Sequence, residues 1–229
     1  MDLNKLQSTI GYTFKNEALL TRAMTHSSYT AEHNKSYSSN NERLEFIGDA
    51  YLDAIVGHKI FDVVQDCTEG VLSRKRAEVV CESSLASIAR DLHIGDFLLL
   101  GNGEEHTGGR DRESMLADAL EALIGAVIID GGFEEGRRVV LNIFAETIRD
   151  SVQGKINNDY KSRLQEFIQK KYNNNDIKYR IVDEQGPAHD KLFTAEVELL
   201  GKVIGRGSGK SKAKAEQAAA EQVISKGEI

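Results

Sequence analysis

The apolar segment from Met115 to Ile129 restricts the fold of this chain more than any other feature. Its length and composition predict a helix that other elements must surround, because a helix that is apolar on nearly every side is normally buried. Asp118 and Glu121 interrupt the segment one turn apart, and no Lys or Arg occurs between residues 112 and 137. An unpaired buried carboxylate is unfavourable unless it binds a proton or a cation. The structural alternative, a solvated acidic face, has little room among these apolar flanks.

A second group of acids lies on the helix predicted from about Asn40 towards Val64. Four of them fall on one side of that helix: Glu42, Glu45, Asp49 and Asp53. Like charges at these spacings repel each other, so folding alone gives no reason for the arrangement. If the two acidic helices meet, their oxygens form a cage suited to a hard divalent cation, and the expected chemistry is metal-assisted hydrolysis of a phosphate ester. Two structural alternatives stay open, because Glu42 could cap its helix and Asp53 could be a plain surface acid.

The chain divides into two parts with different periodicity. Residues 1–149 predict an all-α domain. Its expected helices are Leu3–Ser8, Glu17–Thr25, Asn40–Val64, a single helix from Glu69 through Leu92, Ser114–Asp130 and Phe133–Ile148, with a glycine-rich loop at Gly101–Arg110. Residues 150–158 are polar and lack periodicity, which is typical of a linker.

Residues 159–229 predict a small α+β domain with the order α-β-β-β-α. Tyr160–Lys171 is helical, three alternating segments follow at Ile177–Val182, Phe193–Leu200 and Lys202–Gly207, and Ser211–Ser225 is an alanine-rich helix. On the second strand, one face is expected to consist of Phe193, Ala195, Val197 and Leu199. Helices on one face of an antiparallel sheet are the expected arrangement.

The net charge of −7 conceals an asymmetry between these parts. Residues 1–157 hold 16 basic and 25 acidic residues, a balance of −9, whereas residues 158–229 hold 13 and 11, a balance of +2. Five basic residues and no acid lie between Lys202 and Lys214. An acidic body with a locally basic tail is typical of a protein that binds a polyanion through one part and cations through the other.

Three blocks of this sequence resemble bacterial ribonuclease III. They are Asn41–Ala50, which departs from the family pattern only at Ile47, Glu69–Ala77, and Gly108-Gly109-Arg110 followed by Leu116–Gly125. The resemblance extends over nearly the whole chain and includes a C-terminal double-stranded-RNA-binding domain. It implies an all-α nuclease domain and a homodimeric enzyme that cleaves double-stranded RNA with Mg²⁺, for which Mn²⁺ is expected to substitute. The implied products carry 5′-phosphate and 3′-hydroxyl groups at staggered ends.

The resemblance also assigns roles to individual acids. Glu45, Asp118 and Glu121 would hold Mg²⁺ together with Asp49, and Asp49 and Glu121 would be catalytic, with Asp49 orienting the attacking water. Glu42 and Glu69 match acids that support the same cleft, and Phe46 matches an aromatic residue at the dimer interface. For His26, a structural hydrogen-bonding role is expected.

The tail domain resembles its family at three places that contact duplex RNA. These are Gln165 and Glu166 on the first helix, His189 in the loop Gly186–Asp190, and Lys210, Ser211, Lys212 and Lys214 at the start of the last helix. Duplex RNA is recognised mainly through its 2′-hydroxyls and phosphates, which these side chains could contact. The family often has consecutive lysines where this chain has Lys212-Ala213-Lys214, so the role of Lys214 is left open.

The remaining features agree with a cytoplasmic protein that has no membrane segment. No signal peptide or apolar run of membrane-spanning length is evident, and the two cysteines, Cys67 and Cys81, lack the spacing of a metal site or a disulfide framework. The expected substrates are ribosomal, messenger and small-RNA precursors. Two alternative functions are binding of duplex RNA without cleavage and metal-dependent hydrolysis of phosphate esters on small molecules.

Overall fold

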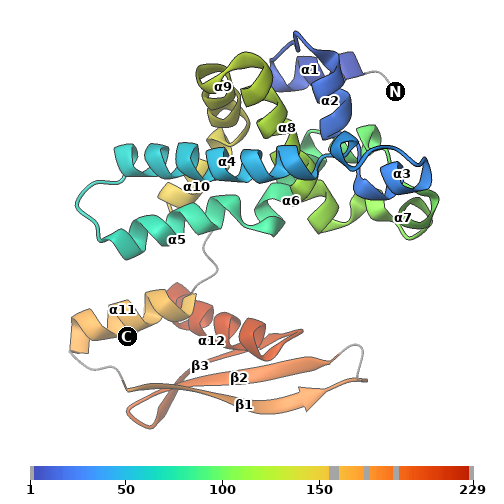
Figure 1. Cartoon of the computed structure of the whole chain (residues 1–229). Coiled ribbons are helices and arrows are strands. Elements are labelled where there is room, and N and C mark those ends of the chain that lie inside the picture. The colour runs from blue at the N-terminus through green and yellow to red at the C-terminus, as the bar shows by residue number, and fades with distance from the viewer. Residues whose placement is uncertain (1–2, 155–159, 173–175, 188–190, 227–229) are drawn as a thin grey trace. The chain divides into compact units, whose positions relative to one another are not determined.

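In a computed structural model of the 229-residue chain, residues 3–154, 160–172, 176–187 and 191–226 are described (Figure 1). The chain separates into a first unit, Met1–Ile156, and a second unit, Asn157–Ile229. The division falls inside the predicted linker 150–158, although helix continues through Val152 at the start of that segment. The predicted fold class, an all-α part followed by a small α+β part, is confirmed.

The described residues of the first unit form helices and short 3-10 turns. In chain order these are α1 (Leu3–Ile10), α2 (Glu17–Ala23), α3 (Ser27–Glu32), η1 (Tyr37–Ser39), α4 (Glu42–Val63), α5 (Glu69–Val80), α6 (Glu82–Asp91), η2 (Ile94–Phe97), α7 (Asn102–His106), η3 (Gly109–Asp111), α8 (Glu113–Gly131), α9 (Phe133–Ile143) and α10 (Ala145–Val152). Among the described residues, none of the helices combines the length and hydrophobicity of a membrane span.

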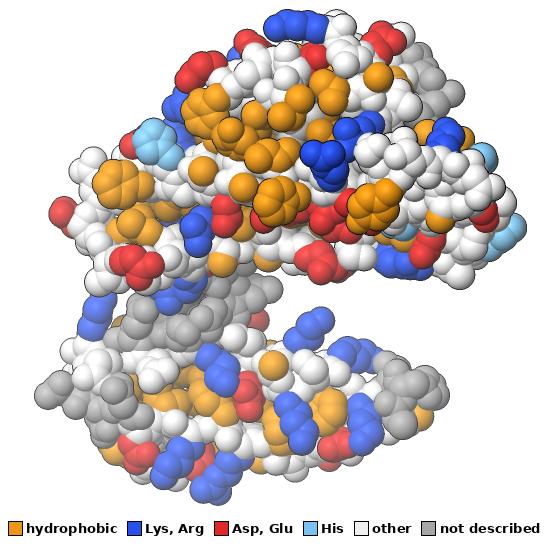
Figure 2. Space-filling model, viewed as in Figure 1, with side chains coloured by type: hydrophobic (Ala, Val, Ile, Leu, Met, Phe, Trp, Pro, Cys, Tyr) orange, Lys and Arg blue, Asp and Glu red, His pale blue; other side chains and the backbone are white. Residues whose placement is uncertain are grey.

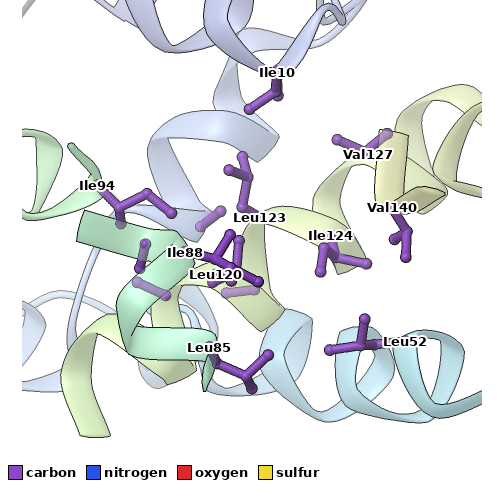
Figure 3. Close-up of a cluster of buried hydrophobic side chains, with 14 of the residues drawn as sticks. Ile10, Leu52, Leu85, Ile88, Ile94, Leu120, Leu123, Ile124, Val127 and Val140 are labelled. Atoms are coloured by element: carbon purple, nitrogen blue, oxygen red, sulfur yellow. The ribbon is translucent and has the colours of Figure 1, made fainter. Parts of the chain in front are cut away.

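Helix α8 is the centre of the first unit, as its apolar sequence predicts. It packs against α2, α4, α6 and α9, and its residues from Ala122 to Ile128 are all buried. Figure 3 shows side chains of four helices meeting in this core: Leu52 of α4, Ile88 of α6, Leu120 of α8 and Val140 of α9. Gly132 ends α8, where a positive φ of 88° suits a residue without a Cβ.

Three predicted boundaries in this unit are wrong. The single helix expected from Glu69 through Leu92 breaks at Cys81, whose extended backbone (φ −69°, ψ 151°) lets α5 pack against α4 while α6 packs against α8. The stretch expected to be loop at Gly101–Arg110 contains α7 and the start of η3. The helix expected from Phe133 to Ile148 is divided at Phe144, which is fully buried. In each case packing rather than local periodicity sets the boundary.

The second unit is a three-stranded antiparallel sheet with two helices on one face (Figure 1). Its elements are α11 (Tyr160–Tyr172), β1 (Ile177–Gln185), β2 (Leu192–Leu199), β3 (Lys202–Gly209) and α12 (Lys212–Lys226), with strand order β1-β2-β3. Of the predicted β2 face, Ala195, Val197 and Leu199 are buried in the core and Phe193 is half-buried against it.

Glycines let α12 lie unusually close to β3. A Cβ added at Gly207 would lie 2.2 Å from the backbone nitrogen of Ala219, and one at Gly209 would lie 2.7 Å from that of Ala215. Only residues without a Cβ fit between this strand and the helix backbone. The N-terminus of α12 is thereby fixed directly beside the end of β3.

Candidate functional site

The site begins at the crossing of α4 and α8, where the two backbones touch. A Cβ added at Gly48 would lie 1.9 Å from the carbonyl oxygen of Glu121, and one added at Gly125 would lie 2.1 Å from that of Leu44. Glycine on each helix therefore permits a contact that any side chain would prevent. This contact places the acidic side of α4 directly against the two acids of α8.

Three carboxylates converge at this crossing: Glu45 of α4 and Asp118 and Glu121 of α8. Each offers an oxygen, and these oxygens lie within 4.8 Å of one another. All three side chains are half-buried, and among the described residues no Lys or Arg forms a salt bridge with them. Three oxygen ligands without a compensating cation match the preference of a small, hard divalent ion that keeps part of its water shell.

The pKa shifts of the three carboxyl groups agree with a binding site for a divalent cation. Burial, followed by the charges of Asp118, Glu42 and Asp49, raises the pKa of Glu45 to about 7. Burial and the neighbouring acids likewise raise the pKa of Glu121 to about 8. Burial also raises the pKa of Asp118. Burial and neighbouring negative charge thus disfavour the ionised form of each of these carboxyl groups, and a bound cation would favour it.

The other predicted acids lie outside this three-residue cluster. Asp49 is exposed, and its charge acts on both Glu45 and Glu121. Glu42 is half-buried, and a hydrogen bond to it raises the pKa of Tyr37. Glu69 is exposed in the first turn of α5, where it accepts a hydrogen bond of 2.6 Å from Ser73 Oγ. Asp53 lies 3.9 Å from the Arg76 guanidinium, yet its charge also reaches Glu121.

Sequence reasoning missed three residues that shape the site: Gly48, Gly125 and Glu82. Gly48 and Gly125 set the helix crossing, and because they lie on two helices remote in sequence, no local pattern predicts their contact. Glu82, at the start of α6, raises the pKa of Asp118 through its charge, and His26 opposes that effect. No sequence signal links Glu82 to Asp118, because the break at Cys81 brings it there.

His26 has the structural role that was expected for it. Its Nδ1 accepts a hydrogen bond of 3.2 Å from the Ser28 backbone N–H and so caps α3. The block Gly108-Gly109-Arg110 is structural too. Arg110 donates hydrogen bonds to the carbonyl oxygens of Gly95 and Leu98, 2.8 Å each, and pairs with Glu105 through two nitrogens.

Helix α4 forms part of a groove whose lining is mainly apolar but includes three charged residues. Phe46 is 77% exposed and lines a surface cavity of about 650 Å³ together with Tyr37, Leu19, Ile47 and Ile129. Figure 2 shows hydrophobic side chains gathered in a band on the visible face of the first unit, with charged side chains around it. A large exposed aromatic residue in such a surface is typical of an interface with another protein.

In the second unit, three lysines and a serine lie around the N-terminus of α12. Lys210, Ser211, Lys212 and Lys214 are all exposed, and Ser211 Oγ accepts a hydrogen bond of 3.2 Å from the Lys214 backbone N–H. Gln165 is exposed on α11. The side chain of Glu166 and the whole of His189 lie outside the described residues. A helix N-terminus with three lysines is a suitable site for phosphate groups.

Comparison with known proteins points to one family. Residues 16–148 match the ribonuclease-III-like family, and residues 160–226 match the double-stranded RNA binding motif. A ribonuclease 3 of Caldanaerobacter subterraneus subsp. tengcongensis is 48% identical over 98% of this chain and 97% of its own length. The ribonuclease 3 of Desulforamulus reducens is 48% identical over 96% and 89%.

Solved structures agree with these relatives. The nuclease domain of ribonuclease III from Campylobacter jejuni is 42% identical, with a TM-score of 0.59, and the match covers 64% of this chain and 95% of that one. A second structure of the same nuclease domain, 43% identical with a TM-score of 0.59 and covering 63% and 97%, concerns flexibility in a region involved in dimer formation.

Proposed function

Because this chain belongs to the ribonuclease III family, we propose that it is a Mg²⁺-dependent endoribonuclease that hydrolyses phosphodiester bonds in double-stranded RNA. The observation that carries the proposal is the convergence of Glu45, Asp118 and Glu121 without a basic partner. A protein that only binds RNA has no need to hold three repelling carboxylates together, since their mutual repulsion destabilises the fold.

The acids take distinct roles in this proposal. Glu45, Asp118 and Glu121 hold Mg²⁺, and Asp49 assists from the exposed side of the same helix. When bound, Mg²⁺ supplies charge that stabilises the phosphate in the transition state and favours ionisation of water. Asp49 and Glu121 orient the attacking water by accepting its hydrogen bonds. Glu42 and Glu69 support the cleft through their negative charge. Cleavage leaves 5′-phosphate and 3′-hydroxyl groups at staggered ends, and Mn²⁺ substitutes for Mg²⁺.

The second unit supplies the affinity for the duplex. We assign residues 1–149 to the nuclease domain, 150–158 to the linker and 159–229 to the RNA-binding domain. Gln165, Glu166 and His189 contact the minor grooves, and Lys210, Ser211, Lys212 and Lys214 contact phosphates between them. The exposed lysines at the start of α12 support this assignment. Precursors of ribosomal, messenger and small RNAs are the proposed substrates. The cytoplasm is the proposed compartment, in agreement with two free cysteines.

The test of the function is cleavage of a perfect RNA duplex with Mg²⁺ and with a chelator. We expect cutting with Mg²⁺ or Mn²⁺ and none with the chelator. The Mg²⁺ concentration that gives the half-maximal rate should decrease as pH is raised from roughly 6 to 9. Protons that compete with Mg²⁺ for Glu45 and Glu121 leave as pH rises through the pKa values of these groups, about 7 and about 8. Binding without cutting at any pH would instead identify a duplex-binding protein that is not a nuclease.

We also propose that two copies of the chain associate through the groove around Phe46. The exposed aromatic ring and its apolar surroundings support this, and one of the solved relatives is described as having a region involved in dimer formation. Replacing Phe46 with Asp should convert the dimer to a monomer, because burying an unpaired carboxylate in an apolar interface is unfavourable.

Light scattering measures the conversion of dimer to monomer directly, as a halving of the molecular mass of the protein in solution. Phe61→Asp is the matched control, since Phe61 is also on α4, is 66% exposed and does not line the groove. A dimer that survives Phe46→Asp, or one that Phe61→Asp dissociates equally well, would contradict the assignment.

A further inference from the structure

Glu184 is an acid placed among the basic residues at one end of the sheet in the second unit. It lies near the end of β1, opposite Phe193 of β2. Its Oε1 accepts a hydrogen bond from Lys191 Nζ. Lys212, the first residue of α12, holds its Nζ 6.0 Å from the centre of the Phe193 ring. The Glu184 carboxylate thus lies near two lysines, Lys191 directly before β2 and Lys212 at the start of α12.

The two lysines act on Glu184 together. The hydrogen bond from Lys191, and then the charges of Lys191 and Lys212, lower the pKa of Glu184 although the side chain is exposed. The carboxylate is therefore ionised at neutral pH and offsets part of the positive charge that α12 presents. Lys212 is also one of the residues proposed to contact RNA phosphates.

The hairpin does not depend on Glu184 for its shape. Asp183 accepts hydrogen bonds from the backbone N–H of Glu184, at 2.9 Å, and from Gln185 Nε2, at 2.6 Å. Strand pairing continues to the end of β1, where Gln185 lies opposite Leu192. Because the fold does not require the Glu184 carboxylate, its charge can influence binding without a role in folding.

The ion pair is also easy to exchange. The side chains of Glu184 and Lys191 are each 40% exposed, and ion pairs at this exposure contribute little to stability. A phosphate carries the same sign of charge as a carboxylate and accepts the same hydrogen bonds from lysine. An RNA phosphate can therefore replace Glu184 as the partner of Lys191 at small cost.

We propose that Glu184 occupies the phosphate-binding position of Lys191 and Lys212 in the free protein and so lowers its affinity for duplex RNA. Lys191 then becomes a further basic contact to the RNA backbone once the carboxylate is displaced. This inference rests on the proposed function, because it names a residue that tunes the affinity of the same enzyme for the same substrate.

The test is Glu184→Gln in the full chain, with binding to an RNA duplex measured in EDTA so that no cleavage occurs. Binding should tighten about two- to fivefold, the range expected for one solvent-exposed charge pair. The logarithmic salt dependence should steepen by about one released ion, because one more lysine meets phosphate. In cleavage assays KM should fall and the single-turnover rate at saturation should not change. A residue that merely braced the hairpin would weaken binding when replaced.

Two variants make the result specific. Glu198→Gln removes the same charge from β2, about 17 Å along the strand from Phe193, where it pairs with Arg180 at 3.4 Å, and it should not tighten binding. Adding Lys191→Gln to Glu184→Gln should remove most of the gain, since Lys191 makes the direct hydrogen bond to Glu184. Unchanged or weaker binding by Glu184→Gln, an equal gain from Glu198→Gln, or a gain that is undiminished without Lys191 would each overturn the inference alone. Failure of the unaltered chain to bind the duplex would overturn the proposed function, and this inference with it.

Discussion

Replacing Glu121 with Gln is expected to abolish cleavage of duplex RNA while leaving RNA binding nearly intact. Glu121 is half-buried at the helix crossing and shares an oxygen cluster with Glu45 and Asp118. The amide keeps the size of the side chain but removes its charge, so the site loses one of its three anionic ligands. Loss of several kcal/mol of transition-state stabilisation from the bound ion corresponds to a rate about 10³-fold lower.

The same substitution should raise the stability of the metal-free protein. Burial and neighbouring acids raise the pKa of Glu121 to about 8, so the folded state disfavours its charge. An acid whose pKa is higher in the folded state than in the unfolded state destabilises the fold progressively as pH rises from the lower pKa to the higher one. Above the higher pKa the full destabilisation remains. The gain in melting temperature should therefore be small near pH 5 and larger near pH 8.

Glu113→Gln is the matched control for this prediction. Glu113 begins the same helix, is exposed and lies 3.5 Å from Arg90, away from the three-residue cluster. It should leave cleavage unchanged within a factor of about two, as surface substitutions normally do. Normal cleavage by Glu121→Gln in Mg²⁺ would remove Glu121 from the catalytic assignment.

Replacing Gly48 with Ala should destabilise the first unit and misplace the acids without touching any of them. The new Cβ would lie 1.9 Å from the carbonyl oxygen of Glu121 and 3.0 Å from the backbone nitrogen of Gly125, so α4 and α8 must separate. Overpacking of this kind costs about 3 kcal/mol. For a unit of this size that lowers the melting temperature by roughly 9 °C. A displacement of about 1 Å between Glu45 and Glu121 lowers the cleavage rate about 10²-fold.

Gly57→Ala separates this effect from helix propensity. Gly57 lies on the same helix, and a Cβ there would be 3.5 Å from the Arg76 side chain, an ordinary contact. Alanine is a better helix former than glycine by about 1 kcal/mol, so this variant should be as stable as the unaltered chain or more so. If Gly48→Ala melts and cleaves like Gly57→Ala, the close crossing does not set the geometry of the acids.

Most helices were predictable from the sequence because their signals are local. The apolar run of α8 and the spacing of acids on α4 depend only on residues within a few turns of each other. The same holds for the alternation in β2 and for the alanine-rich helix α12. The two predicted helices that the structure divides fail for the same reason. At Cys81 and Phe144 the local pattern continues, but the chain turns because the segments on either side pack against different neighbours.

The candidate site was predictable only as a set of acids. Unpaired carboxylates in apolar surroundings indicated a cation site, and the family resemblance named Glu45, Asp49, Asp118 and Glu121. The structure brings three of these within 4.8 Å and leaves Asp49 exposed beside them. It also adds the charges of Glu82 and His26 to the surroundings of Asp118. Neither effect has a local signal, since Glu82 begins α6 and His26 caps α3, both remote in sequence from Asp118.

The sequence by itself determined which residues carry charge, which faces are apolar, and where the period changes from helix to strand. These properties follow from neighbours along the chain. Only the tertiary structure decided how near the acids of α4 come to those of α8. That distance depends on Gly48 and Gly125 meeting across two helices, and a contact between residues remote in sequence leaves no periodic trace. The half-buried acids that made α8 unusual as a sequence form a single site with Glu45 because two glycines let the helix backbones touch.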